Sequence, residues 1–219
     1  MTRTFRRWLP SVVLGAATLA AVIVGPATAA HADAPPTAAG VAPGIPAPGA
    51  TAAMTHHETR LQPNYYYCAP AATRIALSTH GEAVSFDQLA AELRTTTAGT
   101  DSAHDVTRVM NAHFGAGRYK TVEIPGERAT PEQIAVLRND ILVTVGRGDA
   151  VIANVVGSVR DSSGDVHSYP GGHYLTVVGY ADRAGMVRIA DPADAEGTPE
   201  YDLTVTALAN WIGTRGYTA

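Results

Sequence analysis

Cys68 is the only cysteine in the 219 residues. It follows Tyr65-Tyr66-Tyr67 and is followed by an alanine-rich segment that contains Pro70, a pattern that predicts a loop leading into a helix whose first turn begins at the cysteine. Unpaired backbone N–H groups and the positive end of the helix dipole stabilise a thiolate at that position. A single cysteine cannot form an intramolecular disulfide. The alternatives are a buried, inert thiol and a nucleophile, and we predict a nucleophile.

Two further candidates lie at the ends of predicted strands. We expect antiparallel strands over His173–Tyr180 and Met186–Ala190, joined by the turn-rich residues 181–185. A tight hairpin would bring His173 level with Asp191, and opposed or diagonal side chains in such pairs lie roughly 5 to 8 Å apart at Cβ. An imidazole–carboxylate hydrogen bond would then form, although a register slip of one residue would place the two side chains on opposite faces. The alternative for Asp191, which precedes a proline, is an ordinary turn residue.

The elements that must hold these residues change from helices to strands along the chain. Capping signals and apolar spacing predict four helices in the first part: Ala69–Ser78, Ser85 to Leu93, Asp101 or Ser102 to Phe114, and Thr130 to Leu142. The later part is expected to add a buried strand over Asp149–Val156, a short helix over Thr206–Ile212 and a last strand at Tyr217. A helical front half and an antiparallel sheet behind it predict an α+β domain.

Three short segments together resemble a known family. They are Gln62, which stands five intervening residues before Cys68-Ala69-Pro70-Ala71-Ala72, then Gly172-His173-Tyr174, and finally Asp191-Pro192. In this order and placement they are similar to the motifs of C39-like cysteine peptidases of the papain-like superfamily, from about Leu61 to the C-terminus. The resemblance implies a papain-like fold, with a helical N-terminal half packed on an antiparallel sheet. Ala69 departs from the family pattern, which usually has glycine there.

The resemblance also implies a role for each matching residue. Cys68 would attack an acyl carbonyl as the thiolate and form a thioester, and His173 would hold the thiol proton and deliver it to the leaving amine. Asp191 would fix the imidazole tautomer and favour the imidazolium. The Gln62 side-chain amide and the Cys68 backbone N–H would donate to the developing oxyanion. Considered without its spacing to Cys68, Gln62 would be interpreted as a surface residue.

Other chemistry-bearing residues give weaker signals. His56 and His57 are adjacent and do not converge easily on one metal, and the spacing of His104 and His113 places them on different faces of a helix. His167 lies in a polar loop and is expected at most to line the cleft. No phosphate loop, dinucleotide-binding fingerprint or EF-hand pattern is present in the sequence. We therefore expect neither a metal nor a cofactor.

The N-terminal part reads as a targeting segment. Residues 1–32 combine a basic start with the uncharged run Val12–Val24 and small residues before Ala32, which predicts a signal peptide cleaved after Ala32. The run is shorter than the roughly 20 residues of a membrane span, so an uncleaved anchor is the less favoured alternative; the export route, general or twin-arginine, stays open. Residues 33–55 are rich in Ala, Pro and Gly and predict a disordered spacer, followed by a C39-like peptidase domain over 56–219.

Charge narrows the class of partner. Three of the 16 basic residues lie in the predicted signal peptide, which leaves 13 basic against 20 acidic residues. A chain of this charge is a poor candidate for binding nucleic acid or an anionic membrane surface. We expect a secreted, monomeric cysteine peptidase without stable membrane insertion, acting on a peptide or protein. The alternatives are a cell-wall amidase or acyltransferase of the same superfamily and a non-catalytic peptide-binding module.

Overall fold

The computed structural model describes residues 53–181, 185–193 and 199–219. The predicted signal peptide, most of the predicted spacer and the middle of the predicted hairpin turn lie outside the described residues. Within them the chain forms five helices and seven strands: β1 (Ala53–Met54), α1 (Cys68–Ser78), α2 (Phe86–Glu92), α3 (Ala103–Phe114), β2 (Thr121–Ile124), α4 (Pro131–Gly146), β3 (Val151–Arg160), β4 (Val166–Ala181), β5 (Met186–Ala190), β6 (Glu200–Thr204), α5 (Val205–Ile212) and β7 (Arg215–Thr218).

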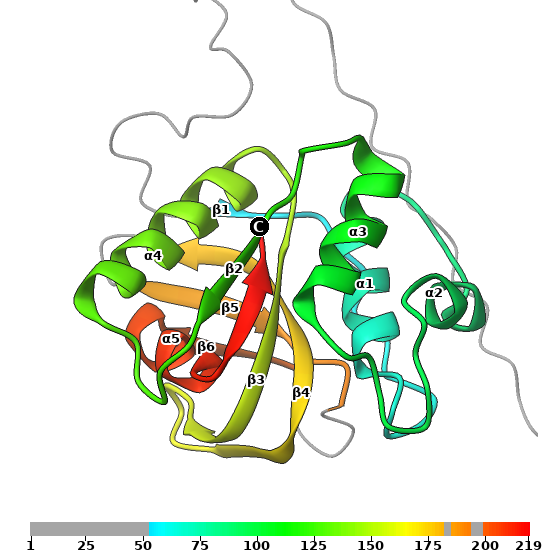
Figure 1. The fold of residues 1–219 in the computed structure, drawn as a ribbon. Helices are drawn as coiled ribbons and strands as arrows, with labels where there is room; N and C mark the ends of the chain where they lie inside the picture. Colours follow the sequence, from blue (N-terminus) through cyan, green and yellow to red (C-terminus); the bar gives the residue numbers. More distant parts are fainter. Residues whose placement is uncertain (1–52, 182–184, 194–198) are drawn as a thin grey trace, which may run out of the picture. The chain divides into compact units, whose positions relative to one another are not determined.

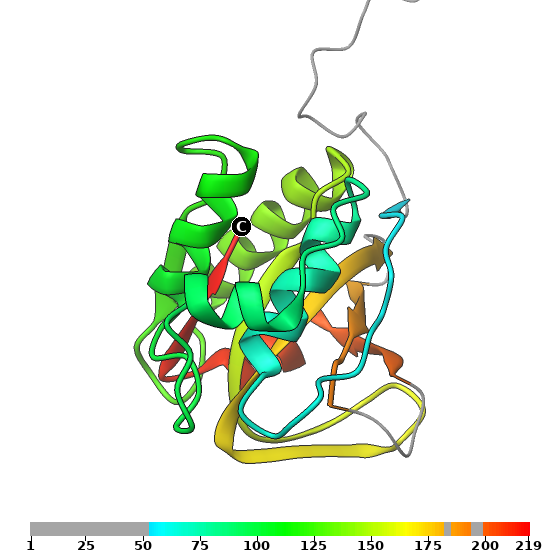
Figure 2. The same ribbon diagram turned by 90° about the vertical axis from the view of Figure 1, so that its right-hand side faces the viewer.

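The strands form a single antiparallel sheet (Figure 1). Its order is β2-β7-β3-β4-β5-β6, and β1 pairs with the end of β4. Helices α1, α2 and α3 cover one face of the sheet and α4 and α5 cover the other (Figures 1 and 2). The predicted α+β class, with a helical N-terminal half packed on an antiparallel sheet, is confirmed.

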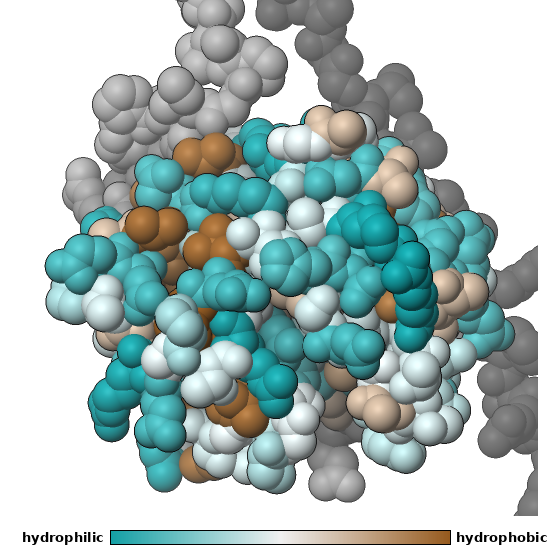
Figure 3. All heavy atoms as spheres, in the orientation of Figure 1, coloured by the Kyte–Doolittle hydropathy of each residue, from teal (hydrophilic) through white to brown (hydrophobic). Residues whose placement is uncertain are grey.

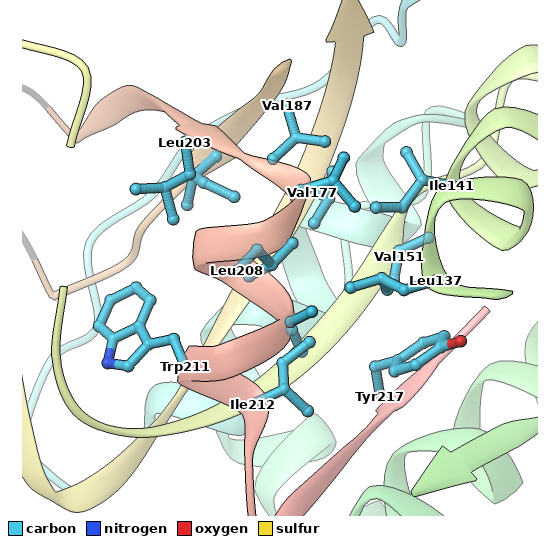
Figure 4. Packing of buried hydrophobic residues seen from close by; sticks show 14 of the residues in the cluster. Leu137, Ile141, Val151, Val177, Val187, Leu203, Leu208, Trp211, Ile212 and Tyr217 are labelled. Atoms are coloured by element: carbon cyan, nitrogen blue, oxygen red, sulfur yellow. The ribbon is translucent and has the colours of Figure 1, made fainter. Parts of the chain in front are cut away.

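Alternation along the central strands builds a core on each face. In β3, Val151 and Val155 pack with α4 and α5, whereas Ile152 packs with α1 and α3, because successive side chains of a strand point to opposite faces. On the face that α4 and α5 cover, Leu208 and Ile212 of α5 lie against the sheet (Figure 4). Fully burying a side chain of this size stabilises the fold by about 1.5–3 kcal/mol.

Two helices, α2 and α4, carry the N-terminal caps that their sequences predict. The Ser85 hydroxyl accepts from the Gln88 N–H at 3.2 Å, and Thr130 forms a complete capping box with Gln133. In contrast, α1 begins at Cys68, and the residue before it, Tyr67, provides no side-chain cap. The first-turn N–H groups of α1 are therefore left without a capping side chain, and this is the helix that carries the thiol.

The sheet is more extensive than predicted. Strand β4 begins at Val166, seven residues before the expected start at His173, and strands β2 and β6 were not predicted. Pro170 and two glycines are untypical of a strand, and they explain why the first half of β4 was not predicted. These residues lie in a bulge where three residues of β4 oppose the single residue Val156 of β3. A proline is tolerated at such a place because no ladder hydrogen bond is required of it.

The first strand modifies one predicted boundary. Ala53 and Met54 pair with Tyr180 and Gly179 of β4, and the next residue, Thr55, is buried. Strand β1 thus lies within the range predicted as disordered spacer, three residues before the predicted domain start at residue 56. Backbone pairing with β4 supplies the stabilisation that the composition of this segment does not indicate.

The surface over α3, β2 and α4 is mixed in character. Figure 3 shows hydrophilic residues gathered over α3 and small hydrophobic patches on the side of α4. None of the helices in the described ranges is both long enough and apolar enough to cross a membrane.

Candidate active site

Cys68 lies at the N-terminus of α1, where the helix packs on β4. Its side chain is largely buried, with 8% of the residue exposed. The hydroxyl of Thr176 in β4 donates to the Ala72 carbonyl of α1 at 2.9 Å, which ties the helix to the strand that carries His173. The exposed part of Cys68 opens into a pocket of about 180 Å³ that His173 also lines.

His173 stands at the point where β4 recovers from its bulge. It pairs with Val155 of β3, immediately after Gly172, which has a φ of +96°. That backbone conformation suits glycine. The ring is 4% exposed, and its Nε2 lies 2.7 Å from the Asp191 Oδ1. Since Nε2 is engaged by the carboxylate, Nδ1 is the ring nitrogen left for the interaction with Cys68.

Asp191 is fully buried, and within the described part of the chain its carboxylate has four hydrogen-bonding partners. Oδ1 contacts His173 Nε2 and accepts from the Ala193 N–H at 2.9 Å. Oδ2 accepts from the hydroxyl of Tyr169 at 2.9 Å and from that of Tyr201 at 2.7 Å. A carboxylate held by this many donors keeps its charge even when it is shielded from water.

A register shift in the β4–β5 ladder brings His173 and Asp191 to the same side. Pairing begins with Ala181 opposite Met186, shifts by one residue between Val177 and Gly179, and ends with Thr176 opposite Ala190. Continued by one residue, the ladder places Asp191 opposite Leu175, two residues from His173 and on the same face. Without the shift Asp191 would oppose Thr176, and His173 would point to the other face.

The three side chains change one another's protonation. Burial alone would raise the pKa of the Cys68 thiol, but His173 and the backbone N–H groups of Tyr174 and Ala69 lower that pKa below its usual value. Burial would lower the pKa of His173, but its bond to Asp191 and its interaction with Cys68 raise that pKa to about 9. This is the pattern of a thiolate–imidazolium pair.

Asp191 completes the pattern. Burial would raise its pKa, yet the contact with His173, the Ala193 N–H and the Tyr201 hydroxyl hold the pKa of this carboxyl below its usual value. The carboxylate is therefore ionised near neutral pH and faces a cationic imidazole. Chemically, the cluster joins a low-pKa thiol, a group that holds its proton and a fixed carboxylate.

Gln62 lies on the other side of His173. It lines a second pocket, of about 390 Å³, together with Tyr169, His173 and Pro192. Its backbone N–H donates to the Pro192 carbonyl at 2.8 Å, and its side-chain N–H donates to the Asn64 carbonyl at 2.7 Å. The two pockets share Gly172 and His173. One of the two amide hydrogens of Gln62 is thus committed to the loop, and the predicted oxyanion role stays a prediction.

Sequence reasoning missed the two tyrosines around Asp191. The ring of Tyr169 lies 3.9 Å from that of His173, centroid to centroid, so it covers the imidazole as well as donating to Asp191. The ring of Tyr201 stacks on His167 at 3.7 Å, and His167 Nε2 lies 3.0 Å from Asp161 Oδ2. A local signal could have flagged Tyr169, four residues before His173, but Tyr201 belongs to the unpredicted strand β6.

Other histidines contact carboxylates outside the cluster of Cys68, His173 and Asp191. His113 contacts Glu82 and Glu92 with its two ring nitrogens, both at 2.9 Å, and His104 contacts Glu123 at 3.3 Å. Across the part of the chain that the structure describes, no group of three or more His, Cys, Asp or Glu side chains is arranged to hold a metal ion.

Solved structures with a similar backbone come from peptidase domains. The peptidase domain of Streptococcus ComA, a bi-functional ABC transporter involved in a quorum-sensing pathway, is 15% identical with a TM-score of 0.48, and the match covers 75% of this chain and 97% of that one. A double glycine motif protease from an AMS/PCAT transporter, solved in complex with the leader peptide, is 11% identical with a TM-score of 0.45, covering 76% and 91%.

A family profile matches the same part of the chain. No protein with a curated description matches the chain. The profile described as the Peptidase_C39 like family matches residues 53–219, which include every described residue and therefore Cys68, His173 and Asp191. The α+β architecture, with the cysteine at a helix start and the histidine on the sheet, is the papain-like fold expected for that family. On this match the chain belongs to the C39-like peptidase family.

Proposed function

We propose that this protein is a cysteine peptidase that hydrolyses peptide bonds through a Cys68-His173-Asp191 triad and a thioester intermediate. One observation carries the proposal: a low-pKa thiol at an uncapped helix start interacts with an imidazole whose other nitrogen is 2.7 Å from a buried carboxylate. Family membership supports the same chemistry, and the pocket gives a substrate access to the sulfur.

Acylation begins with the ion pair. The Cys68 thiolate attacks the carbonyl carbon of the scissile peptide bond and forms a C–S bond, and the carbonyl π electrons move to oxygen. As the oxyanion collapses, the C–N bond breaks and the His173 imidazolium passes its Nδ1 proton to the departing amine. Asp191, which contacts Nε2, keeps the ring oriented and stabilises its charged form.

Deacylation reverses the roles. The neutral His173 takes a proton from water, the resulting hydroxide attacks the thioester carbon, and the C–S bond breaks to release a carboxylic acid and restore the ion pair. The oxyanion is stabilised in both steps by the Cys68 backbone N–H, which belongs to the uncapped first turn of α1. The Gln62 amide assists by its second hydrogen once substrate fills the cleft.

We also propose that the protein works outside the cell after removal of residues 1–32. The basic start, the uncharged run and the small residues before Ala32 support export. Immunodetection of the N-terminally processed protein in culture supernatant tests this, and retention of the unprocessed chain in the cell would contradict it.

The decisive experiment uses the single thiol. Because Cys68 is the only cysteine, a thiol-specific alkylating reagent labels one site, and labelling near neutral pH should be fast and should abolish hydrolysis of a peptide library. Cys68→Ser should remove both labelling and turnover. Hydrolysis that survives this substitution would overturn the proposal.

The same assay separates the alternatives. Hydrolysis of peptidoglycan fragments with no hydrolysis of linear peptides would favour the amidase alternative, in which the triad is kept and the substrate differs. Binding of peptides without turnover by wild-type protein, at any pH between about 5 and 9, would favour a non-catalytic module, since the imidazolium at His173 persists to a pKa of about 9.

A further inference from the structure

Arg215 is a charged residue that lines the cleft but has no role in the proposed mechanism. It is the first residue of β7 and is exposed. It lines the pocket of about 180 Å³ that contains Cys68 and His173, and also a neighbouring pocket of about 370 Å³. Asp101 and Asn154 line both pockets as well. The two pockets therefore form one groove that leads from the thiol past the Arg215 guanidinium.

The guanidinium lies beside the residue that precedes the catalytic histidine. A Cβ added to Gly172 would lie 3.5 Å from Arg215 Nη2, so the guanidinium packs over the glycine at contact distance. Gly172 has no side chain, so this residue fills none of the pocket that Arg215 and Cys68 both line. A substrate residue close to the scissile bond would reach this cation.

Arg215 differs from the arginines that serve the fold. Arg118 and Arg147 hold Asp149, and Arg188 contacts Asp202 at 3.2 Å. The Arg215 backbone pairs with Ile124 in the sheet, but its side chain makes no hydrogen bond or ion pair with any of the residues that the structure describes. An arginine presents five donors in a planar fork that matches a carboxylate, so this one is available for a ligand.

Acidic residues also line the groove and would weaken the binding of a carboxylate at Arg215. Asp101 lines both pockets but makes no ion pair with Arg215, so the two charges stay apart across the groove. Glu123, in the outer pocket, contacts His104 at 3.3 Å. A carboxylate bound at Arg215 thus shares the groove with Asp101, which has no ion pair among the described residues, and with Glu123 of the outer pocket. Both acidic residues moderate its affinity.

We propose that Arg215 binds a carboxylate of the peptide substrate next to the scissile bond and gives the enzyme a preference for acidic substrates. The inference rests on the proposed peptidase function and specifies its substrate class. The carboxylate comes either from an Asp or Glu side chain or from the C-terminus of a short substrate. An exposed guanidinium–carboxylate pair predicts a preference of about five- to tenfold at low salt, decreasing as salt screens it.

The test compares peptides that differ only in that carboxylate. One series replaces Glu by Gln at each position on both sides of the cleaved bond, and a second pairs C-terminal acids with amides. The ratio of kcat/KM within each pair cancels any general effect of a substitution on Cys68 or His173. Arg215→Gln should bring the ratio to about 1, and Arg215→Glu should invert it, because the cation that binds the carboxylate is removed or replaced by an anion.

Two further variants sharpen the result. Arg128→Glu makes the same change of net charge at an exposed residue outside both pockets, and its ratios should equal those of the wild type. Asp101→Asn removes the opposing anion and should increase the preference for acidic peptides. The first peptide series responding alone would identify a side-chain carboxylate, and the second alone a C-terminal one.

A binding measurement keeps the inference separate from the proposed function. The affinities of the same peptide pairs for the Cys68→Ala protein are measured by fluorescence anisotropy, which requires no turnover. Preferential binding of the acidic member that disappears in Cys68→Ala/Arg215→Glu supports the inference even if the wild type hydrolyses nothing, in which case only the proposed function fails. Equal binding of acidic and neutral peptides, or a preference that survives Arg215→Glu, would overturn it.

Discussion

Two fully buried aspartates, Asp149 and Asp191, illustrate two ways of keeping a carboxylate inside this protein. Asp149, just before β3, accepts from Arg118 at 2.7 and 3.0 Å and also from Arg147, and it lies 2.6 Å from a ring nitrogen of His80. Asp191, just after β5, lies 2.7 Å from a ring nitrogen of His173, and its other partners are two tyrosine hydroxyls and a backbone N–H.

The difference lies in what balances the charge. Burial would raise the pKa of Asp149, but Arg118, His80 and Arg147 lower it, and an arginine keeps its charge at all ordinary pH values. Among the described residues, the other donors to Asp191 are neutral, so the titratable imidazole is the group that compensates the negative charge. A structural carboxylate is thus balanced by permanent cations, and the candidate catalytic one by a cation that can lose its proton.

The largest contrast is expected between the two histidines. His173→Ala should lower kcat/KM by about 10³–10⁴-fold, since both proton transfers depend on the ring, and should slow alkylation of Cys68 near neutral pH. His80→Ala, the matched control on the Asp149 cluster, should leave kcat/KM within about twofold. Peptide hydrolysis and alkylation kinetics measure both. Unchanged alkylation in His173→Ala would contradict the ion pair.

Asp149→Asn should affect stability and leave the chemistry intact. It leaves two arginines without their carboxylate, which for a buried pair costs about 3–5 kcal/mol. Because the Arg118 and Arg147 side chains are 34% and 22% exposed, we expect about 2–4 kcal/mol after solvent screening. Urea unfolding measures this. A loss of activity in the protein that remains folded would mean that the two clusters are coupled.

Asp191→Asn should show the opposite pattern, with a larger effect on activity than on stability. The amide oxygen still accepts from His173, so the ring keeps its place, but the imidazolium loses its countercharge. We expect kcat/KM to decrease by about 10–100-fold, the effect of weakening one hydrogen bond to a charged group, and less than for His173→Ala. The alkaline limb of the pH profile should move to lower pH, because the raised pKa of His173 depends on Asp191 first among its favourable partners. Equal or higher activity would remove Asp191 from the site.

The pH dependence of stability provides a further contrast. The pKa of His173 is about 9 in the folded protein, above its usual value near 6.5, so its protonated form stabilises the fold fully below about pH 6.5 and that contribution is lost as the pH rises through about 9. Urea unfolding at about pH 7 and pH 9.5 should show a loss of about 1–2 kcal/mol in the wild type that His173→Ala lacks. A parallel decline in both proteins would argue against a charged His173.

The smallest effects are expected at the tyrosines. Tyr201→Phe and Tyr169→Phe each remove one donor to Oδ2 of Asp191 and keep the ring, so kcat should decrease by about three- to tenfold with KM little changed. The acid limb of the pH profile should move to higher pH, because a carboxylate with fewer donors has a higher pKa. Tyr217→Phe, which removes a 2.9 Å bond to Asp140 far from the triad, is the control and should leave the profile unchanged.

Local sequence signals predicted much of the helical half. Ser85 and Thr130 cap their helices through their own neighbours in the sequence, and the helix start at Cys68 required only a proline and an alanine-rich segment. The α+β class and the family followed from the same short segments. These features depend on residues within one or two helical turns, which a sequence displays directly.

The sheet required information that is not local. The Ala53 carbonyl lies 3.0 Å from where a Cβ of Gly179 would be, so β1 approaches β4 closely at the register shift between Val177 and Gly179. No pattern near His173 or Asp191 reveals that shift, although it brings the two side chains to one face. Tyr201 was missed for the same reason, because β6 is placed by its pairing with β5.

Strand β1 also limits how much of the N-terminal part the proposed processing could remove without exposing β4. The backbone N–H and the hydroxyl of Thr55 both donate to the Val178 carbonyl, at 2.8 and 3.1 Å, so the last residues before the domain shield backbone groups of β4. A processing protease that stopped short of Ala53 would leave the pairing of β1 with β4 intact. A cut a few residues later would remove β1 and leave backbone N–H and C=O groups at this edge of β4 unpaired. Such an edge favours self-association of the shortened protein.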